Sequence, residues 1–160
     1  MGNMKTIFGS LLILAFLSVS FSTIAQELEG TNFEDLTLEE ALEKASIEGK
    51  RVFVDCYTLS CRPCIFIIEH IFPKKEVGDY FNKYFISLKK NMTEGEGIEI
   101  REKYNIMILP TFLIFEPDGN LLCKLEGGSV RNKDDDFVEM FKERIKPYEL
   151  RSAEKQENKN

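Results

Sequence analysis

The sequence predicts an α/β fold in which helices cover both faces of a central mixed β-sheet. Helical and strand patterns alternate along most of the chain, and such alternation places helices on both faces of a largely parallel sheet. The turn Pro117–Asn120 then separates two apolar runs, which indicates a β-hairpin and adds antiparallel strands. The expected order is helix, strand, helix, helix, strand, helix, strand, strand, helix.

The first helix and the first strand have the clearest signals. Thr37 and Glu40 have the spacing of a capping box, and Gly49 is a helix stop. Val52–Cys56 is a short apolar run rich in β-branched residues, which is typical of a buried central strand. We therefore expect a helix between Thr37 and Gly49 that leads directly into the central strand.

Weaker patterns predict the remaining elements. A helix should begin at Cys61 and end at Pro73, because proline lacks the N–H that a helix interior needs. The other expected elements are a helix at 74–84, a strand at 85–89, a helix at 98–104, a strand at 106–115 interrupted by Pro110, a strand at 121–125, and a helix from Phe137 that stops at Pro147.

Residues 1–25 have the pattern of a cleaved secretory signal peptide. Lys5 supplies a positive charge, residues 11–17 form an apolar run, and Thr23–Ala25 offers small residues before Gln26. An uncleaved membrane anchor is the alternative. Cleavage would leave no stable membrane insertion and would place the protein in the periplasm or outside the cell.

The mature chain is expected to be one domain at 26–150, followed by a disordered polar tail at 151–160. Removing Lys5 lowers the basic count from 21 to 20 against 27 acidic residues, a net charge of −7. With no basic patch, nucleic acid is not an expected partner. Export would let disulfides form and persist.

Cys61-Arg62-Pro63-Cys64 is the motif that carries most chemical information. Two thiols separated by two residues can close a disulfide across one helical turn, and a helix N-terminus favours the thiolate of its first cysteine. The thiolate is the reactive species in disulfide exchange. Zinc sites and static disulfides use the same spacing, but the strand before the motif and the helix after it favour redox chemistry.

Leu109-Pro110-Thr111 is the second motif. A proline inside an apolar strand cannot donate a ladder hydrogen bond, so it belongs at an edge, a strand start or a bulge. A trans proline in a loop is one interpretation. With the CxxC pair upstream, we expect instead a cis bond that makes a tight bend at the start of a strand.

These motifs together resemble the thioredoxin superfamily, over most of residues 34–146. The resemblance implies a thioredoxin-like fold and is greatest to exported bacterial members, including the periplasmic C-terminal domain of the transmembrane thiol–disulfide transporter. It implies that Cys61 attacks a substrate disulfide and that Cys64 resolves the mixed disulfide. It also makes Asp55 the buried acid that exchanges a proton with Cys64.

Further roles follow from the same resemblance. Lys89 matches a strand lysine beside the buried acid, although a slip of one residue would put Lys90 there instead. Leu109 and Pro110 would line a groove for an extended substrate peptide, and Arg62 and Pro63 would border it. We expect the protein to use no cofactor and no metal.

Three positions depart from the family pattern. Ser60 replaces the usual aromatic residue before the first cysteine, Arg62 replaces a small residue, and Ile65 replaces a basic one. The charge of Arg62 should stabilise a thiolate at Cys61. The redox poise of this pair is therefore expected to differ from that of a general reductant.

The other two cysteines are expected to be passengers. Cys56 should point to the face of its strand opposite Asp55, and Cys123 should lie in the second strand of the hairpin. With one strand between them they would be about 10 Å apart, too far for a disulfide. The same geometry argues against a zinc site that combines all four cysteines.

The sequence thus favours an exported thiol–disulfide oxidoreductase that exchanges disulfides with protein substrates through Cys61 and Cys64. Its partners would be exported proteins with disulfides, together with a membrane thiol–disulfide transporter as a possible electron source. The alternative is a non-catalytic thioredoxin-like binding module in which the Cys61–Cys64 disulfide is structural.

Overall fold

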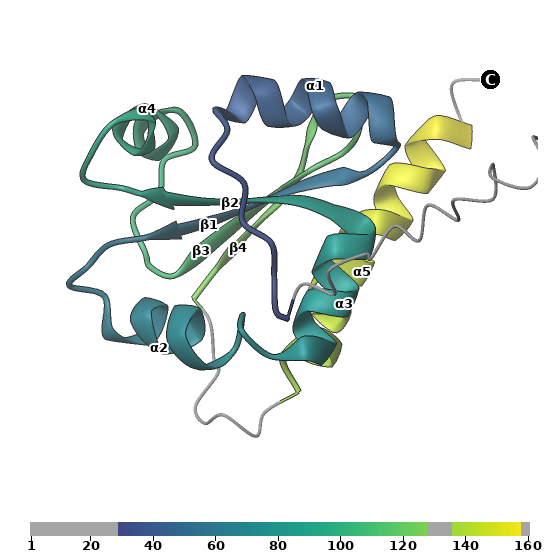
Figure 1. Cartoon of the computed structure of the whole chain (residues 1–160). Coiled ribbons are helices and arrows are strands. Elements are labelled where there is room, and N and C mark those ends of the chain that lie inside the picture. Colours follow the sequence, from purple (N-terminus) through teal and green to yellow (C-terminus); the bar gives the residue numbers. More distant parts are fainter. Residues whose placement is uncertain (1–28, 128–135, 158–160) are drawn as a thin grey trace, which may run out of the picture.

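The computed structural model of the protein describes residues 29–127 and 136–157, and the elements follow in the predicted order (Figure 1). They are α1 (Leu38–Glu48), β1 (Arg51–Tyr57), α2 (Arg62–His70), α3 (Lys75–Tyr84), β2 (Phe85–Asn91), α4 (Glu96–Lys103), β3 (Thr111–Phe115), β4 (Leu121–Glu126) and α5 (Phe137–Glu157).

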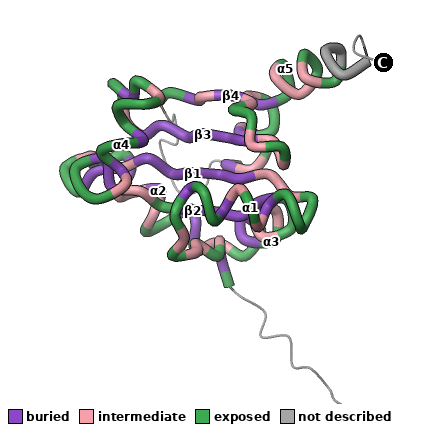
Figure 2. Tube along the Cα trace, turned by 90° about the horizontal axis from the view of Figure 1, so that it is seen from above, coloured by how far each residue is buried: buried purple, intermediate pink, exposed green. Residues whose placement is uncertain are grey.

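Within the described residues the sheet has four strands in the order β2-β1-β3-β4. β1 is parallel to β2 and antiparallel to β3, and β3 and β4 form the predicted hairpin. The mixed sheet predicted from the sequence is therefore confirmed. β1 lies in its interior, and its five inner residues are buried, as the continuous purple of this strand shows in Figure 2.

Figure 1 shows α1 and α4 on one face of the sheet and α2, α3 and α5 on the other. Because side chains alternate along a strand, Val52, Val54 and Cys56 pack against the α1 and α4 face. Phe53 packs on the opposite face, which we call the aromatic face because its core is built largely from phenylalanine rings.

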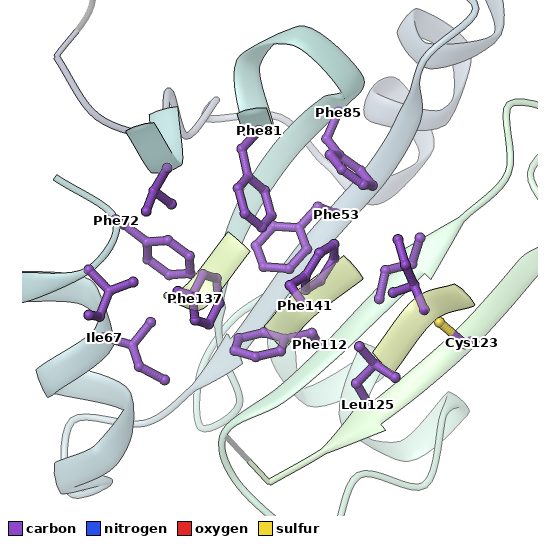
Figure 3. Close-up of a cluster of buried hydrophobic side chains, with 14 residues drawn as sticks. Phe53, Ile67, Phe72, Phe81, Phe85, Phe112, Cys123, Leu125, Phe137 and Phe141 are labelled. Atoms are coloured by element: carbon purple, nitrogen blue, oxygen red, sulfur yellow. The ribbon is translucent and has the colours of Figure 1, made fainter. Parts of the chain in front are cut away.

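The rings of the aromatic face surround Phe53 (Figure 3). Its centroid lies 4.7 Å from that of Phe81 in α3, 5.3 Å from that of Phe112 in β3, and 5.7 Å from that of Phe141 in α5. Truncating a fully buried phenylalanine costs about 3–5 kcal/mol. Phe53 thus joins β1 to two helices and a neighbouring strand, and it anchors the strand that leads to the CxxC motif.

The predicted boundaries of α1 are confirmed. Thr37 Oγ1 accepts a hydrogen bond from the Glu40 backbone N–H at 3.2 Å, and the Glu40 carboxylate accepts one from the Thr37 N–H at 2.8 Å. Gly49 ends the helix with φ of 64°, a left-handed conformation that glycine adopts without steric cost.

The strand predicted at 106–115 begins later than expected, at Thr111. Asn105 has a φ of 49°, which turns the chain out of α4, and residues 106–110 form a loop. Proline 110 has no N–H to give to a ladder, so strand pairing can start only after it. The apolar residues before the proline belong to this loop and not to the sheet.

The prediction that the last helix stops at Pro147 is wrong. α5 continues to Glu157 with Pro147 inside it, so residues 151–157, expected to be disordered, are helical. A proline inside a helix costs roughly 3 kcal/mol. Contacts beyond the proline oppose this cost, because Tyr148 packs against the aromatic cluster and Glu149 pairs with Arg51.

An N-terminal segment before α1 extends the sheet at its β2 edge. Phe33 makes an isolated parallel bridge with Ser87, and its ring meets that of Phe72 at 4.9 Å. The predicted signal peptide at 1–25 lies outside the described residues. Among the helices described, none has both the length and the hydropathy needed to span a bilayer.

Candidate redox site

The CxxC motif lies at the start of α2, immediately beyond the carboxyl end of β1. Cys61 is the N-cap residue of the helix, Pro63 lies in its first turn, and Cys61 and Cys64 form a disulfide with their Cα atoms 5.3 Å apart. The Cys64 backbone N–H points at Cys61 Sγ, 3.3 Å away. A sulfur that develops negative charge at Cys61 would therefore meet an amide donor and the positive end of a helix dipole.

The two cysteine residues differ in exposure. Cys64 is 1% exposed and belongs to the buried side of α2, whereas Cys61 is half-buried and Arg62 and Pro63 are exposed. Exchange requires an attacking sulfur to approach along the S–S bond, so access decides which sulfur reacts. The geometry presents Cys61 to a partner and shields Cys64.

A short turn holds Cys61 in place. The Cys61 backbone N–H donates to the Thr58 carbonyl at 3.1 Å, and the hydroxyl oxygens of Thr58 and Ser60 are 3.3 Å apart. Thr58 is buried, while Leu59 between them is 76% exposed. Thr58 and Leu59 were not predicted from the sequence. The available signal for Leu59 was an apolar residue in a polar turn beside the CxxC motif.

Asp55 is buried in the sheet, on the same face as Phe53. The helix α2 covers this face, because its Ile67 belongs to the same core cluster as Phe53. It is 1% exposed, and its Oδ2 has no hydrogen-bond partner within the described residues. Burial raises the pKa of Asp55 to about 7, and the charge of Lys89 opposes that rise. A carboxyl group that titrates near neutral pH can both give and take a proton under physiological conditions.

The structure separates the two adjacent lysines. Lys89 is the register partner of Asp55 across the parallel β1–β2 pair, and its Nζ lies 5.0 Å from the ring centroid of Phe33. Lys90 points elsewhere, donating to the Leu36 carbonyl at 2.6 Å and pairing with Glu96 at 2.7 Å. Lys89 is therefore the lysine beside the buried acid, and Phe33 is a contact that the sequence did not reveal.

The peptide bond between Leu109 and Pro110 is cis, as the sequence predicted. Pro110 is buried and its carbonyl accepts from the Gly127 N–H at 2.8 Å, while Thr111 Oγ1 donates to the Ile108 carbonyl at 2.6 Å. Thr111 pairs with Cys56, so the proline lies at the carboxyl end of β1. The cis bend and the CxxC motif thus both lie at the carboxyl end of β1.

The remaining cysteines are free and buried, as expected. Cys56 packs on the α1 and α4 face and Cys123 on the aromatic face, with β3 between their strands. Burial raises the pKa of the Cys56 thiol well above its usual value and that of Cys123 to about 12. Both thiols stay protonated and are poor nucleophiles. His70 is exposed, at the end of α2.

Comparisons with known proteins agree with this geometry. A profile of the thioredoxin-like domain family matches residues 38–145, more than half of the chain. The thiol:disulfide interchange protein DsbD of Colwellia psychrerythraea is 28% identical over 124 residues, which are 73% of this chain but 20% of that protein's length.

Solved structures give the same picture. A candidate disulphide-isomerase of Bacteroides thetaiotaomicron is 40% identical, with a TM-score of 0.57 over 63% of this chain and 84% of that chain. A thioredoxin of Thermus thermophilus is 22% identical, with a TM-score of 0.52 over 69% of this chain and 82% of its own, and shows the likeness of the fold.

Proposed function

The chain belongs to the family of thioredoxin-like domains, and on that premise we propose that it is an exported thiol–disulfide oxidoreductase that exchanges disulfides with protein substrates. One arrangement carries the proposal. A half-buried Cys61 caps a helix and is bonded to a shielded Cys64, at the end of a strand that holds a buried Asp55, whose Oδ2 has no hydrogen-bond partner in the described part of the chain. The similarity to DsbD supports a place in disulfide transfer.

The exchange begins at Cys61. When the pair is oxidised, a partner thiolate attacks Cys61 Sγ, a mixed disulfide forms, and the electron pair of the broken bond leaves with Cys64. A second thiolate of the partner then attacks the partner sulfur that is bonded to Cys61 Sγ. The mixed disulfide breaks, and its electron pair leaves with Cys61. The partner loses two electrons and gains a disulfide. The reverse sequence reduces a partner disulfide, with Cys61 attacking and Cys64 resolving.

Asp55 is the proposed proton carrier for Cys64. A thiolate released in the shielded position of Cys64 is costly, because burial penalises the charged form. A neutral Asp55 can give it a proton, and an ionised Asp55 can take that proton back when Cys64 has to attack. A pKa of about 7 for Asp55 suits both directions. Lys89, opposite Asp55, stabilises its ionised form.

The surface beside Cys61 is the proposed substrate contact. Arg62 and Pro63 are exposed on the helix side. Leu109 is half-buried and precedes the cis bond at the carboxyl end of β1, so its backbone can pair with an extended peptide. Pro110 is buried and shapes the bend beside it.

Export is part of the same proposal. It rests on the signal-like residues 1–25, which lead to the periplasm or the outside of the cell. The chain from Gln26 onward would then be exported, with exported disulfide proteins as substrates and a membrane thiol–disulfide transporter as electron source. N-terminal sequencing of protein recovered from an exported fraction would test the cleavage before Gln26.

Reduction of insulin disulfides tests the activity. With dithiothreitol as electron donor, the protein should speed insulin reduction, and Cys61→Ser should abolish the acceleration because the attacking sulfur is lost. Cys123→Ala is the matched control, since it removes a buried thiol of another strand. A wild type no faster than dithiothreitol alone would favour the alternative, a binding module with a structural disulfide.

A further inference from the structure

The last strand of the sheet holds the loop that carries the bend at Pro110. Lys124 Nζ in β4 donates to the Asn105 carbonyl at 3.1 Å, just before this loop begins. Where the loop ends, the Gly127 N–H donates to the Pro110 carbonyl at 2.8 Å. β4 and the residue after it therefore hold both ends of the loop that contains Leu109.

The bond from Gly127 is the last step of the β3–β4 ladder. Thr111 and Glu126 are register partners, and Pro110 and Gly127 are the next residues along the chain on each side. Proline has no N–H, so its carbonyl is the only backbone group of Pro110 that can enter a ladder. Within this ladder, the position of the Pro110 carbonyl is therefore set by Gly127.

Gly127 lies just outside β4, where the chain leaves the direction of the strand. Its φ of 68° is in the left-handed region, which glycine adopts without steric cost. Its N–H and its carbonyl serve different partners: the N–H donates to Pro110, and the carbonyl accepts from Arg144 of α5. Gly127 is thus the link between the bend and α5.

The guanidinium of Arg144 holds the end of β4. Its Nη1 donates to the Gly127 carbonyl at 2.7 Å and its Nη2 to the Glu126 carbonyl at 2.9 Å. Both hydrogen bonds that this guanidinium makes within the described residues go to main-chain carbonyls, and neither goes to a carboxylate. The planar fork of an arginine fixes two acceptors at once, and hydrogen bonds from a charged donor are stronger than neutral ones.

The helix α5 fixes this guanidinium relative to the core. Phe141 and Ile145, on either side of Arg144 in the helix, are 1% and 2% exposed and belong to the core of the aromatic face. The donor is therefore carried by a firmly packed helix, and the end of β4 cannot shift without breaking its bonds to that helix.

We propose that Arg144 is a positioning residue for disulfide exchange. Through the carbonyls of Glu126 and Gly127 it fixes the Gly127 N–H, which in turn fixes the Pro110 carbonyl and the Leu109 backbone beside it. The inference rests on the proposed function, in which an extended segment of the substrate pairs with this backbone. Arg144 should therefore matter for partners that bring a peptide backbone to the site, and not for the reaction of the redox pair with small disulfides.

Two disulfides of the same chemistry test the positioning role. A peptide with one central cysteine bonded to a chromogenic thiol offers backbone on both sides of its disulfide, whereas 2-mercaptoethanol bonded to the same thiol offers none. In both reactions the Cys61 thiolate attacks the other sulfur, and the chromogenic thiolate leaves with the electron pair of the broken bond. The second-order rate constant of the reduced protein is measured for each. Their ratio reports the contribution of the peptide backbone.

Arg144→Met should lower this ratio about threefold to tenfold, the range expected for the loss of one hydrogen bond between substrate and protein. The rate constant for the small disulfide should not change. Arg144→Lys keeps the charge but has no fork that spans two carbonyls, so its ratio should lie between those of Arg144→Met and the wild type. Arg151→Met is the control on the same helix. Arg151 Nε donates to the Pro147 carbonyl, so this variant should keep the wild-type ratio.

Hydrogen exchange adds a measurement that needs no substrate. In the oxidised protein, the Gly127 amide should exchange several times faster in Arg144→Met than in the wild type. The amides of β1 should keep their protection, which shows that the variant is folded. If β1 loses its protection in Arg144→Met, both measurements pass to Arg144→Lys, and wild-type values there overturn the inference.

The outcomes separate this inference from the proposed function. An unchanged ratio, an equal fall of both rate constants, or an unchanged exchange rate at Gly127 would overturn the positioning role and leave the proposed function in place. A wild type that reacts with both disulfides no faster than free glutathione would refute the proposed function, and the inference with it.

Discussion

β1 carries an ionisable side chain near each end, and the fold surrounds the two differently. At the amino end, Arg51 Nε pairs with Glu116 at 2.9 Å, and its guanidinium also pairs with Glu149 of α5. At the carboxyl end, Asp55 is more deeply buried and its Oδ2 has no partner in the described part of the chain. The ion pairs of Arg51 join elements together, whereas burial displaces the pKa of Asp55, as the proposed proton transfer requires.

The contrast also holds across the sheet. Asp55 and Cys56 are adjacent, and burial raises the pKa of both. The carboxyl group starts from a low value, so the rise brings it to about 7 and into the physiological range. The thiol starts higher, so the same effect removes it from that range. Burial therefore creates a reactive group on one face and an inert one on the other.

The largest expected effect comes from replacing Asp55. Its pKa is raised from 3.8 to about 7 by folding, so the folded chain keeps a proton that the unfolded chain releases between these values. The stability due to neutral Asp55 is complete below about pH 4 and is lost as the pH rises to about 7. The wild type loses this stability as the pH rises, and Asp55→Asn does not. The free energy of unfolding of Asp55→Asn, relative to that of the wild type, should therefore increase by roughly 2–5 kcal/mol from about pH 4 to about pH 8.

Urea unfolding of the oxidised protein at both pH values measures this difference. Asp55→Asn should also slow the resolving step, because Cys64 loses its proton acceptor. Asp79→Asn is the control, since this carboxylate is 59% exposed on α3. A stability difference that does not change with pH would mean that Asp55 is ionised in the folded protein, and it would remove the contrast with Arg51.

The opposite sign is expected at Arg51. Arg51→Met leaves the carboxylates of Glu116 and Glu149 without their cation, and it should lower the free energy of unfolding by about 1–3 kcal/mol. A double-mutant cycle with Glu116→Gln isolates the pair, and it should show a positive coupling energy. Additive losses in the cycle would show that Arg51 stabilises by packing its side-chain carbons instead.

A smaller change should follow from the lysine beside the acid. Lys89→Met removes a cation that lowers the pKa of Asp55, so that pKa should rise further. Lys89 is exposed, and solvent screening limits the rise to about a fraction of a unit. Carboxyl-carbon NMR of Asp55 during a pH titration measures it. Lys90→Met is the matched control, and an equal rise in both variants would refute the specific role of Lys89.

The smallest effect is expected at Arg62. Its guanidinium is exposed one residue from Cys61, so it stabilises the Cys61 thiolate weakly. Arg62→Gly should lower the reduction potential of the pair by about 10–20 mV, because a less stabilised thiolate makes the disulfide less oxidising. Equilibration with glutathione buffers measures it. An unchanged potential at low salt would assign Arg62 to partner contact alone.

Features with local causes were predictable from the sequence. The capping box of Thr37, the stop at Gly49 and the hairpin turn each depend on a few adjacent residues, so they appear in the structure as predicted. The CxxC pair at a helix start and the cis bond before Pro110 are equally local. These features were enough to identify the family and the position of the candidate site.

Only the tertiary structure decided the features that depend on distant partners. α5 passes Pro147 because Tyr148 and Glu149 find contacts on the aromatic cluster and on Arg51. The register of β2 decides that Lys89, and not Lys90, faces Asp55. The pKa of Asp55 follows from how completely the sheet and its helices exclude water. Each of these is a property of packing between segments far apart in the chain, which no local pattern records.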